Sequence, residues 1–203
     1  MAIDQGIFIH AGTHRGVDLI YFEDLMENID GDWRSIRLKS LTESQKIKLK
    51  NNSFFYLQQE YNYKYLMKES KYSSFCSELV GKIFRRSQID IFKGKSVSKI
   101  IPADFDKEAD SGLNWIDVTD NVANRFQYMK SDSNKFRENY EAMALALILE
   151  QAKREPDARL YQGMVIESAK GENISPEFYK KVKNLRQQIS KSSDISFWNN
   201  EYP

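Results

Sequence analysis

The single cysteine of this chain, Cys76, sets the strongest limit on what the chain can fold into. One cysteine excludes an intrachain disulfide and any zinc site built from several cysteines. An apolar core must therefore hold the fold, and 203 residues are enough for one domain with a sizeable core, or for a domain with an appendage. Aromatic residues make up 13% of the chain, which favours a well-packed globule over a disordered chain.

The charge balance and the apolar pattern narrow the partners and the location. The net charge of +1 gives no electrostatic case for binding nucleic acid or a membrane surface. No apolar run approaches the roughly 20 residues of a membrane span. Residues 1–6 lack the charged and apolar regions of a classical signal peptide. We therefore expect a protein that is cytoplasmic or exported by a non-classical route, with no metal and no cofactor. The many Lys, Asn, Ile and Tyr residues are typical of AT-rich bacterial genomes.

The stretch around the cysteine predicts a helix with Cys76 in its first turn. Either Ser73 or Ser74 can serve as the N-cap, and apolar residues then recur at helical spacing to about Arg86. They are Leu79, Val80, Ile83 and Phe84. Backbone N–H groups and the helix dipole at this place favour a negative charge, so the thiol ionises more readily. A nucleophilic cysteine needs this placement, although a lone cysteine is most often a small buried hydrophobe.

The rest of the first 120 residues predicts strands and short helices. Residues 2–10 form a hairpin in which Gly6 takes a positive φ at the turn, and the strand before that turn is cut short. A capping box at Thr42 and Gln45 opens a long helix. Pro102 begins a turn followed by a single helical turn. Further strands are expected at 17–20, 33–38 and 113–118, a short helix at 21–28, and a loop at 68–74.

From about residue 133 the chain predicts only helices. One helix carries its apolar side chains on one side over 136–151, and it ends before Pro156. Asp157 caps the next, and Ser175 followed by Pro176 is a clear start signal for the last, which runs to about Ser190. The order of strands first and helices later favours an α+β fold.

Specific residues give the first 120 positions a resemblance to a known group of enzymes. Tyr72 to Val80 matches an aromatic-Cys-Ser-Glu-Leu-Val nucleophile helix, and Ile7 to Ala11 matches the strand after a catalytic hairpin. Residues 16–28, 61–65 and 101–105 match the flanking segments. A histidine-bearing hairpin before the cysteine reverses the usual papain order. The chain thus resembles the circularly permuted papain-like branch of the NlpC/P60 superfamily, which includes YiiX/YaeF-like amidases and lecithin:retinol acyltransferase-like proteins.

The resemblance implies a fold, two domains and a set of site residues. An antiparallel sheet would pack on the cysteine helix in a permuted papain-like domain at 1–125, and a helical extension at 126–203 would pack on that domain. Cys76 would be the nucleophile in an acyl transfer and His10 the catalytic histidine, with Tyr72 and Ser77 as substrate-binding residues. Backbone N–H groups at the start of the helix would stabilise the oxyanion.

The resemblance leaves the general base open. Its base histidine usually starts the first hairpin strand, which here falls at Met1 or just before it, and His10 occupies the second position, that of the orienting residue. Three interpretations follow. The base lies upstream of Met1; or His10, with His14 as a less favoured substitute, is itself the base; or the protein is a catalytically incomplete relative that keeps the fold for binding.

The predicted function is that of a thiol hydrolase or acyltransferase acting on an amide. A peptide or cell-wall peptide is the favoured substrate, and a lipid acyl ester is the next. The alternatives are a papain-like binding protein with an incomplete site and an effector toxin of the same fold. The helices beyond residue 125 could also hold a protein partner or form an oligomer interface.

Overall fold

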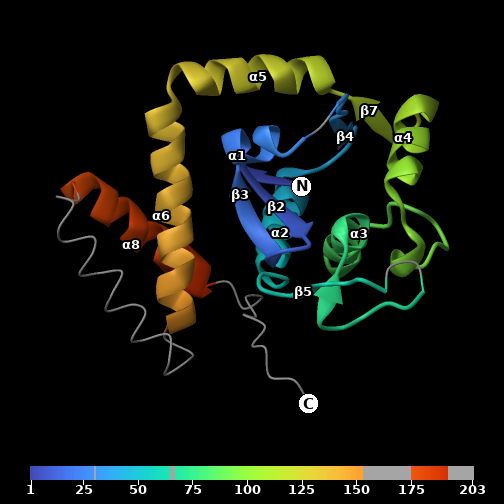
Figure 1. The fold of residues 1–203 in the computed structure, drawn as a ribbon, viewed down its shortest axis with the longest axis horizontal. Helices are drawn as coiled ribbons and strands as arrows, with labels where there is room; N and C mark the ends of the chain where they lie inside the picture. The colour runs from blue at the N-terminus through green and yellow to red at the C-terminus, as the bar shows by residue number, and fades with distance from the viewer. Residues whose placement is uncertain (30, 65–66, 153–174, 192–203) are drawn as a thin grey trace. The chain divides into compact units, whose positions relative to one another are not determined.

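A computed structural model describes residues 1–29, 31–64, 67–152 and 175–191 of the chain. These residues fall into two compact units (Figure 1). The first is Met1–Ser131, which holds all seven strands of the described residues, and the second is helical and lies within Asp132–Ile195. The boundary predicted from the sequence was at residue 125. The helix predicted to begin at Asp157 lies outside the described residues.

The strands of the first unit form three small sheets. They are β1 (Ala2–Asp4), β2 (Ile7–Gly12), β3 (Gly16–Tyr21), β4 (Ile36–Leu38), β5 (Glu60–Tyr61), β6 (Ser73–Ser74) and β7 (Trp115–Asp117). The largest sheet has the order β1-β2-β3 and is antiparallel throughout. A second antiparallel sheet pairs β4 with β7, and a short parallel sheet pairs β5 with β6.

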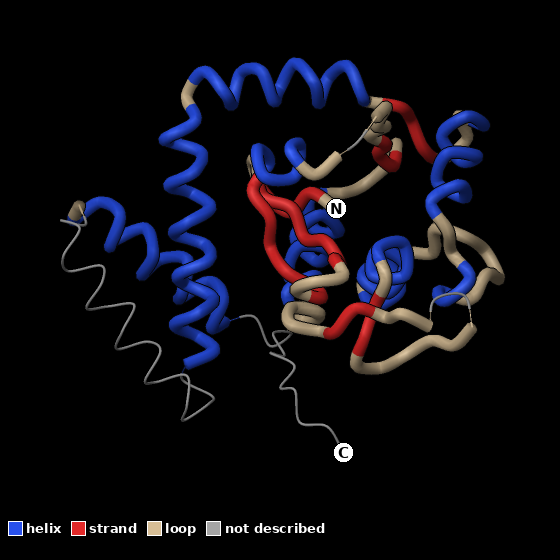
Figure 2. Tube along the Cα trace, in the orientation of Figure 1, coloured by secondary structure: helices blue, strands red, loops and turns tan. Residues whose placement is uncertain are grey.

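Helices cover these sheets and complete the first unit. They are α1 (Phe22–Glu27), α2 (Glu43–Phe54), α3 (Cys76–Arg86), the 3-10 turn η1 (Val97–Lys99), α4 (Pro102–Ser111) and α5 (Thr119–Ser131). Helix α3 contacts β2, α2 and η1, and Figure 2 shows it beside the three red strands of the hairpin sheet. The prediction that the chain combines helices with strands is therefore confirmed.

The core of the first unit lies on one face of β2 and β3. Alternate residues of β2 are buried, as the period of a half-buried strand requires, while Phe8 and His10 point to the other face. Helix α5 brings Phe126 to that other face. The ring centre of Phe126 lies 6.0 Å from that of Phe8. The Phe126 ring also stacks on the Phe22 ring, with the two centres 5.4 Å apart. The buried apolar residues of β2, β3 and α3 are Ile7, Ile9, Ala11, Val17, Leu19, Tyr21, Leu79, Ile83 and Phe84.

The second unit pairs two helices, α6 (Ser133–Ala152) and α8 (Pro176–Lys191). Ser175 Oγ accepts a hydrogen bond of 3.1 Å from Phe178 N, which confirms the predicted start of the last helix. Two ion pairs join the helices, Lys181 to Glu138 at 3.0 Å and Arg186 to the buried Glu150 at 2.8 Å. The apolar residues buried along the two helices are Phe136, Ala142, Met143, Ala146, Leu147, Val182 and Ile189.

Local predictions of the first unit have mixed outcomes. Thr42 and Gln45 form the predicted capping box, and Gly6 has φ +71° at the hairpin turn. The N-cap of the cysteine helix is Phe75, so the prediction of Ser73 or Ser74 is wrong. These two serines form β6 inside the segment 68–74 that was predicted as a loop. The Pro102 turn is a full helix to Ser111, and α5 begins at Thr119, before the helical extension that was predicted from residue 126.

Candidate active site

Cys76 is the first residue of α3 and its side chain is exposed. Phe75 precedes it in an extended conformation, with φ −95° and ψ 171°, so the chain turns into the helix at the cysteine. The apolar face of α3 anchors the helix, because Leu79 and Ile83 are 1% and 0% exposed. The anchored helix therefore presents the Cys76 thiol to solvent at its N-terminal end, where the helix dipole favours a negative charge.

His10 lies on β2, on the face opposite the core residues of that strand. Its direct partner across the β2–β3 pair is Asp18. Burial lowers the pKa of His10 below its ordinary 6.5, the Asp18 carboxylate opposes that shift, and the positive charges of the Met1 amino group and Arg15 reinforce it. The imidazole is consequently neutral at pH 7, the form that can accept a proton.

The N-terminal end of β1 lies close to both Cys76 and His10. The Met1 amino group donates a 2.8 Å hydrogen bond to Ile9 O, and Ile9 N donates to Met1 O at 2.9 Å. Burial lowers the pKa of this amino group to about 6, and the nearby Cys76 opposes the shift. Because the same amino group interacts electrostatically with His10 and with Cys76, the three residues lie in one neighbourhood.

The thiol and the histidines are not directly bonded. Within the residues that the structure describes, no hydrogen bond joins Cys76 Sγ to His10 or to His14. His14 is exposed in the turn between β2 and β3.

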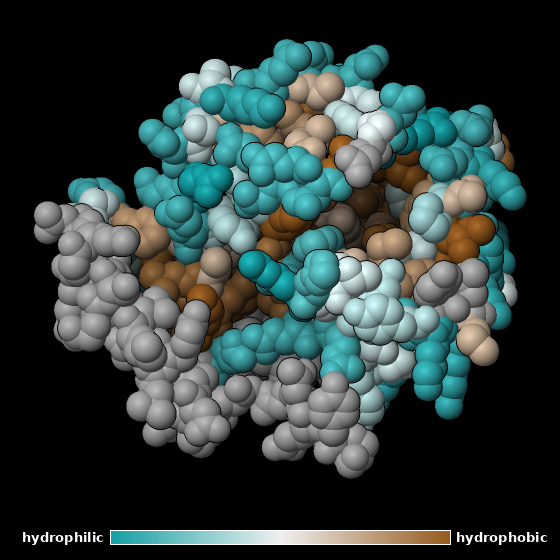
Figure 3. Space-filling view, viewed as in Figure 1, coloured by the Kyte–Doolittle hydropathy of each residue, from teal (hydrophilic) through white to brown (hydrophobic). Residues whose placement is uncertain are grey.

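Figure 3 shows the surface hollowed, with brown apolar atoms at its floor, in the part of the view where Figure 1 places the N-terminus and α3.

The two predicted substrate-binding residues differ in environment. The Tyr72 side chain is 58% exposed, with Lys71 Nζ 5.3 Å from its ring centre. The Ser77 side chain is buried, and its hydroxyl donates a 2.7 Å hydrogen bond to Ile100 O. The Ser77 hydroxyl therefore ties α3 to the segment that precedes α4.

Sequence reasoning missed a buried polar group behind the cysteine, formed by Asn62, Glu78 and Lys82. The Glu78 side chain is fully buried. The spacing of Glu78 and Lys82, one helical turn apart, was the available signal, since such pairs form ion pairs on helices.

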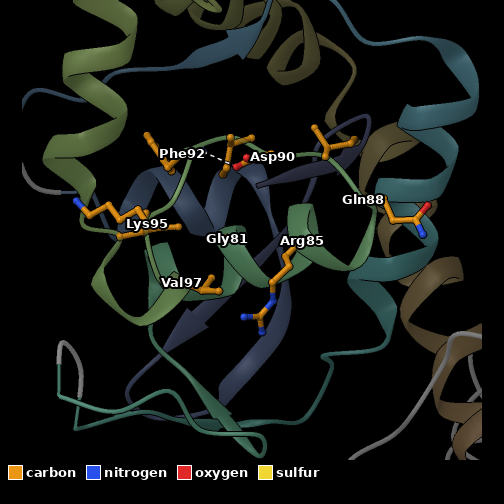
Figure 4. Close-up of a pocket in the computed structure, with 10 residues that line it drawn as sticks. Gly81, Arg85, Gln88, Asp90, Phe92, Lys95 and Val97 are labelled. Atoms are coloured by element: carbon orange, nitrogen blue, oxygen red, sulfur yellow. Dashed lines mark hydrogen bonds between the residues drawn. The ribbon is translucent and has the colours of Figure 1, made fainter.

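A separate pocket of about 220 Å³ lies against the later part of α3. Its lining residues all fall between Gly81 and Ile100 in the sequence, and Figure 4 shows Gly81, Arg85 and Val97 among them. Its two cationic side chains already have acidic partners, because Arg85 pairs with Glu69 and Lys95 pairs with Asp104 at 2.6 Å. Cys76 and His10 are not among its lining residues.

Metal-ligand clusters and membrane spans are both missing from the part of the chain that the structure describes. Among these residues, no group of three or more His, Cys, Asp or Glu side chains could hold a metal ion. In the same residues, no helix combines the length and the apolar character needed to cross a membrane.

Comparison with known protein families gives a match to most of the first unit. Residues 2–136 match a family model described as "Permuted papain-like amidase enzyme, YaeF/YiiX, C92 family". The matched stretch includes Cys76, His10 and the hairpin sheet. No curated protein and no solved structure gives a significant match to the chain.

Proposed function

This chain belongs to the permuted papain-like amidase family, and we propose that it hydrolyses an amide bond through a thioester formed on Cys76. The observation that carries the proposal is the exposed thiol at the start of α3, in one neighbourhood with His10 and the end of β1. A peptide or cell-wall peptide is the proposed substrate class, because the family is one of amidases.

The proposed chemistry has two halves. In the first, the thiol loses its proton to His10, the Cys76 sulfur bonds to the amide carbon, and the carbonyl electrons move to oxygen. The first-turn N–H groups of α3 stabilise that oxyanion. The C–N bond then breaks, and the leaving amine takes the proton from His10. In the second half a water molecule gives one proton to His10 and its oxygen bonds to the thioester carbon. The C–S bond then breaks, the acid leaves, and His10 returns the proton to the Cys76 sulfur, which restores the thiol.

The proposed roles follow from the environment of each side chain. His10 is neutral at pH 7 and is our candidate for the proton acceptor, directly or through one water molecule. Tyr72 is exposed four residues before the nucleophile and is our candidate for contacting the substrate. The Ser77 hydroxyl donates its hydrogen bond to Ile100 O, so we propose that Ser77 contacts the substrate through its backbone N–H instead.

A binding module is the second candidate function. The observation that favours it is the lack of a hydrogen bond between Cys76 and either histidine in the described part of the chain. A lipid acyl esterase is tested by the same assays, because a thiolate also attacks esters.

The test combines thiol alkylation with hydrolysis assays. Intact-mass spectrometry follows iodoacetamide labelling at pH 6, and release of nitroaniline from N-acyl-peptide nitroanilides, or of nitrophenol from acyl nitrophenyl esters, follows turnover. We expect labelling of Cys76 at pH 6, amide hydrolysis that disappears in Cys76→Ala, and a loss of roughly 10²-fold or more in His10→Asn. His14→Asn, on the same hairpin, is the matched control and should retain full activity.

Each contrary result points to a defined alternative. Labelling of Cys76 only above pH 8, with no turnover, would replace the enzyme by the binding module. Full activity in His10→Asn would remove His10 as the proton acceptor while leaving the cysteine mechanism in place. Ester hydrolysis without amide hydrolysis would establish the lipid alternative.

A further inference from the structure

The buried polar group behind Cys76 connects the helix to the chain that enters it. Lys82 Nζ donates hydrogen bonds to Ser70 O and Ser73 O, both at 2.7 Å, and to Ser74 Oγ at 3.0 Å. It also lies 3.0 Å from Glu78 Oε1 in an ion pair whose side chains are 3% and 0% exposed. The Lys82 ammonium group therefore binds three residues of the segment that precedes Cys76.

Glu78 holds the other side of the same segment. Its Oε2 accepts a hydrogen bond from the backbone N–H of Phe75 at 3.3 Å and another from Asn62 Nδ2 at 3.0 Å. Asn62 Nδ2 also donates to Lys68 O at 3.3 Å, and Asn62 Oδ1 accepts from Lys64 N at 3.0 Å. The residue next to Cys76 is thus fixed by a carboxylate that is itself fixed by the ammonium.

A buried ion pair of this kind is poorly explained by stability alone. Removing two charges from water carries a penalty that their attraction often only offsets, and apolar replacements of similar volume are frequently as stable. Burial lowers the pKa of Lys82, and the Glu78 carboxylate opposes that shift, so the two charges depend on each other. The bonds to Ser70, Ser73 and Phe75 point to a role in placing the thiol.

We propose that Glu78 and Lys82 are positioning residues whose charge balance controls the reactivity of Cys76. This inference rests on the proposed function, since it assigns to Cys76 the role of nucleophile. The pair holds the segment that enters α3, and its summed charge of zero leaves the helix N-terminus as the dominant local field at the thiol. Loss of one partner leaves an uncompensated buried charge within two turns of the thiol.

Other charged groups near the pair and the thiol stay in place when the pair is changed. Glu69 and Arg85 face Lys82 from the segment before β6 and from the next turn of α3, and they form an ion pair with each other. The Met1 amino group approaches Cys76 from β1. Single substitutions of the buried pair change none of these groups.

The experiment measures iodoacetamide alkylation of Cys76 against pH in the full chain, by intact mass. Lys82→Met leaves the Glu78 carboxylate, which disfavours a second negative charge. Glu78→Gln leaves the Lys82 ammonium, which favours the thiolate. We expect the midpoint of the alkylation profile to rise in the first variant and fall in the second, each by on the order of one pH unit. The double variant, which restores a neutral pair, should return toward the wild-type midpoint.

A control separates buried charge from charge in general. Arg85→Met removes a positive charge from the same helix, but the Arg85 side chain is 58% exposed, so water and salt screen it. The midpoint of the alkylation profile of Arg85→Met should move by no more than about 0.3 pH unit. Urea denaturation of each variant confirms that the alkylated protein is folded. If Lys82→Met does not fold, Glu78→Gln and the double variant still carry the sign of the effect.

The outcomes distinguish this inference from the proposed function. Shifts of both single variants in the same direction, or no shift in either, would overturn the charge-balance role and leave a structural one. The alkylation readout needs no substrate, so opposite shifts would support the inference even if no amide were hydrolysed. Amide hydrolysis combined with unmoved midpoints would retain the enzyme and remove the inference.

Discussion

Gly16 lies where the hairpin approaches the segment that leads to the cysteine. Its φ is +66°, and a Cβ at this position would lie 2.0 Å from Gln59 O, a backbone atom. Two backbone hydrogen bonds join the same two segments, Val17 N to Gln59 O at 2.7 Å and Gln58 N to Val17 O at 2.8 Å. Substitution of Gly16 by alanine should therefore separate β3 from β5.

The magnitude follows from two terms. A left-handed conformation costs an L-residue about 1–2 kcal/mol. Movement of the backbone away from the new Cβ weakens two hydrogen bonds, each with a net contribution of about 1 kcal/mol. Gly16→Ala should therefore lower the free energy of unfolding by about 3–4 kcal/mol, which for a unit of this size corresponds to a fall in Tm of roughly 10 °C.

Urea denaturation followed by circular dichroism measures the effect, and hydrogen exchange of the Val17 and Gln58 amides locates it. Gly112→Ala is the matched control, because Gly112 has φ +61° but an alanine Cβ there would meet nothing within 4 Å. The control should lose only about 1 kcal/mol. A Gly16→Ala variant no less stable than Gly112→Ala would refute the close, rigid approach of Gly16 to Gln59.

Two further predictions concern the surroundings of α3 and β7. Ser77→Ala removes the hydroxyl that donates to Ile100 O inside the protein, so it should lower the free energy of unfolding by about 1–2 kcal/mol in urea denaturation; an unchanged midpoint would show that this bond contributes nothing. Hydrogen bonds from Thr119 and then from Arg34 lower the pKa of Asp117 to about 2 from its ordinary 3.8. Asp117 therefore stabilises the fold above about pH 4 and loses this effect as the pH falls toward 2. Asp117→Asn should flatten the fall of Tm in this window, and an unchanged slope would contradict the assignment.

Signals within a few residues of one another were the ones the sequence predicted well. The capping box at Thr42 and the start at Ser175 each depend on a side chain that bonds its own helix. The turn at Gly6 depends on one residue that tolerates a positive φ. Such features need no distant partner, so a local pattern is enough to identify them.

Tertiary contacts overrode the local signal just before Cys76. Both serines there are good N-cap residues. Ser74 Oγ instead donates to Gln59 Oε1 at 2.7 Å, and Ser73 O accepts from Lys82. Their backbone pairs with β5, which leaves Phe75 at the cap. No sequence pattern near residue 74 indicates that Gln59 and Lys82 will meet it.

The beginning of helix α5, before residue 126, was not predicted because the buried stripe of this helix is narrow. Only Phe126 and Met129 are buried along its 13 residues. The stripe is sufficient because Phe126 packs on aromatic rings from β2 and α1, contacts that are distant in sequence. The amphipathic pattern that identifies most helices needs more apolar positions than this helix uses.

The candidate site divides in the same way between local and distant information. The motif around Cys76 placed the thiol at a helix start, which a local pattern can do. The neighbours of the thiol depend instead on the β1–β2 register, which brings Met1 opposite Ile9, and on the way residues 62–64 and 67–74 lie against α3. Glu78 and Lys82 illustrate the difference most clearly. Their spacing predicts an ion pair on an exposed helix face, and only the segment that covers them turns that pair into a buried one beside the nucleophile. In this chain Glu78, two residues after the cysteine that begins the helix, therefore indicates a buried ion pair only together with Lys82, one turn later.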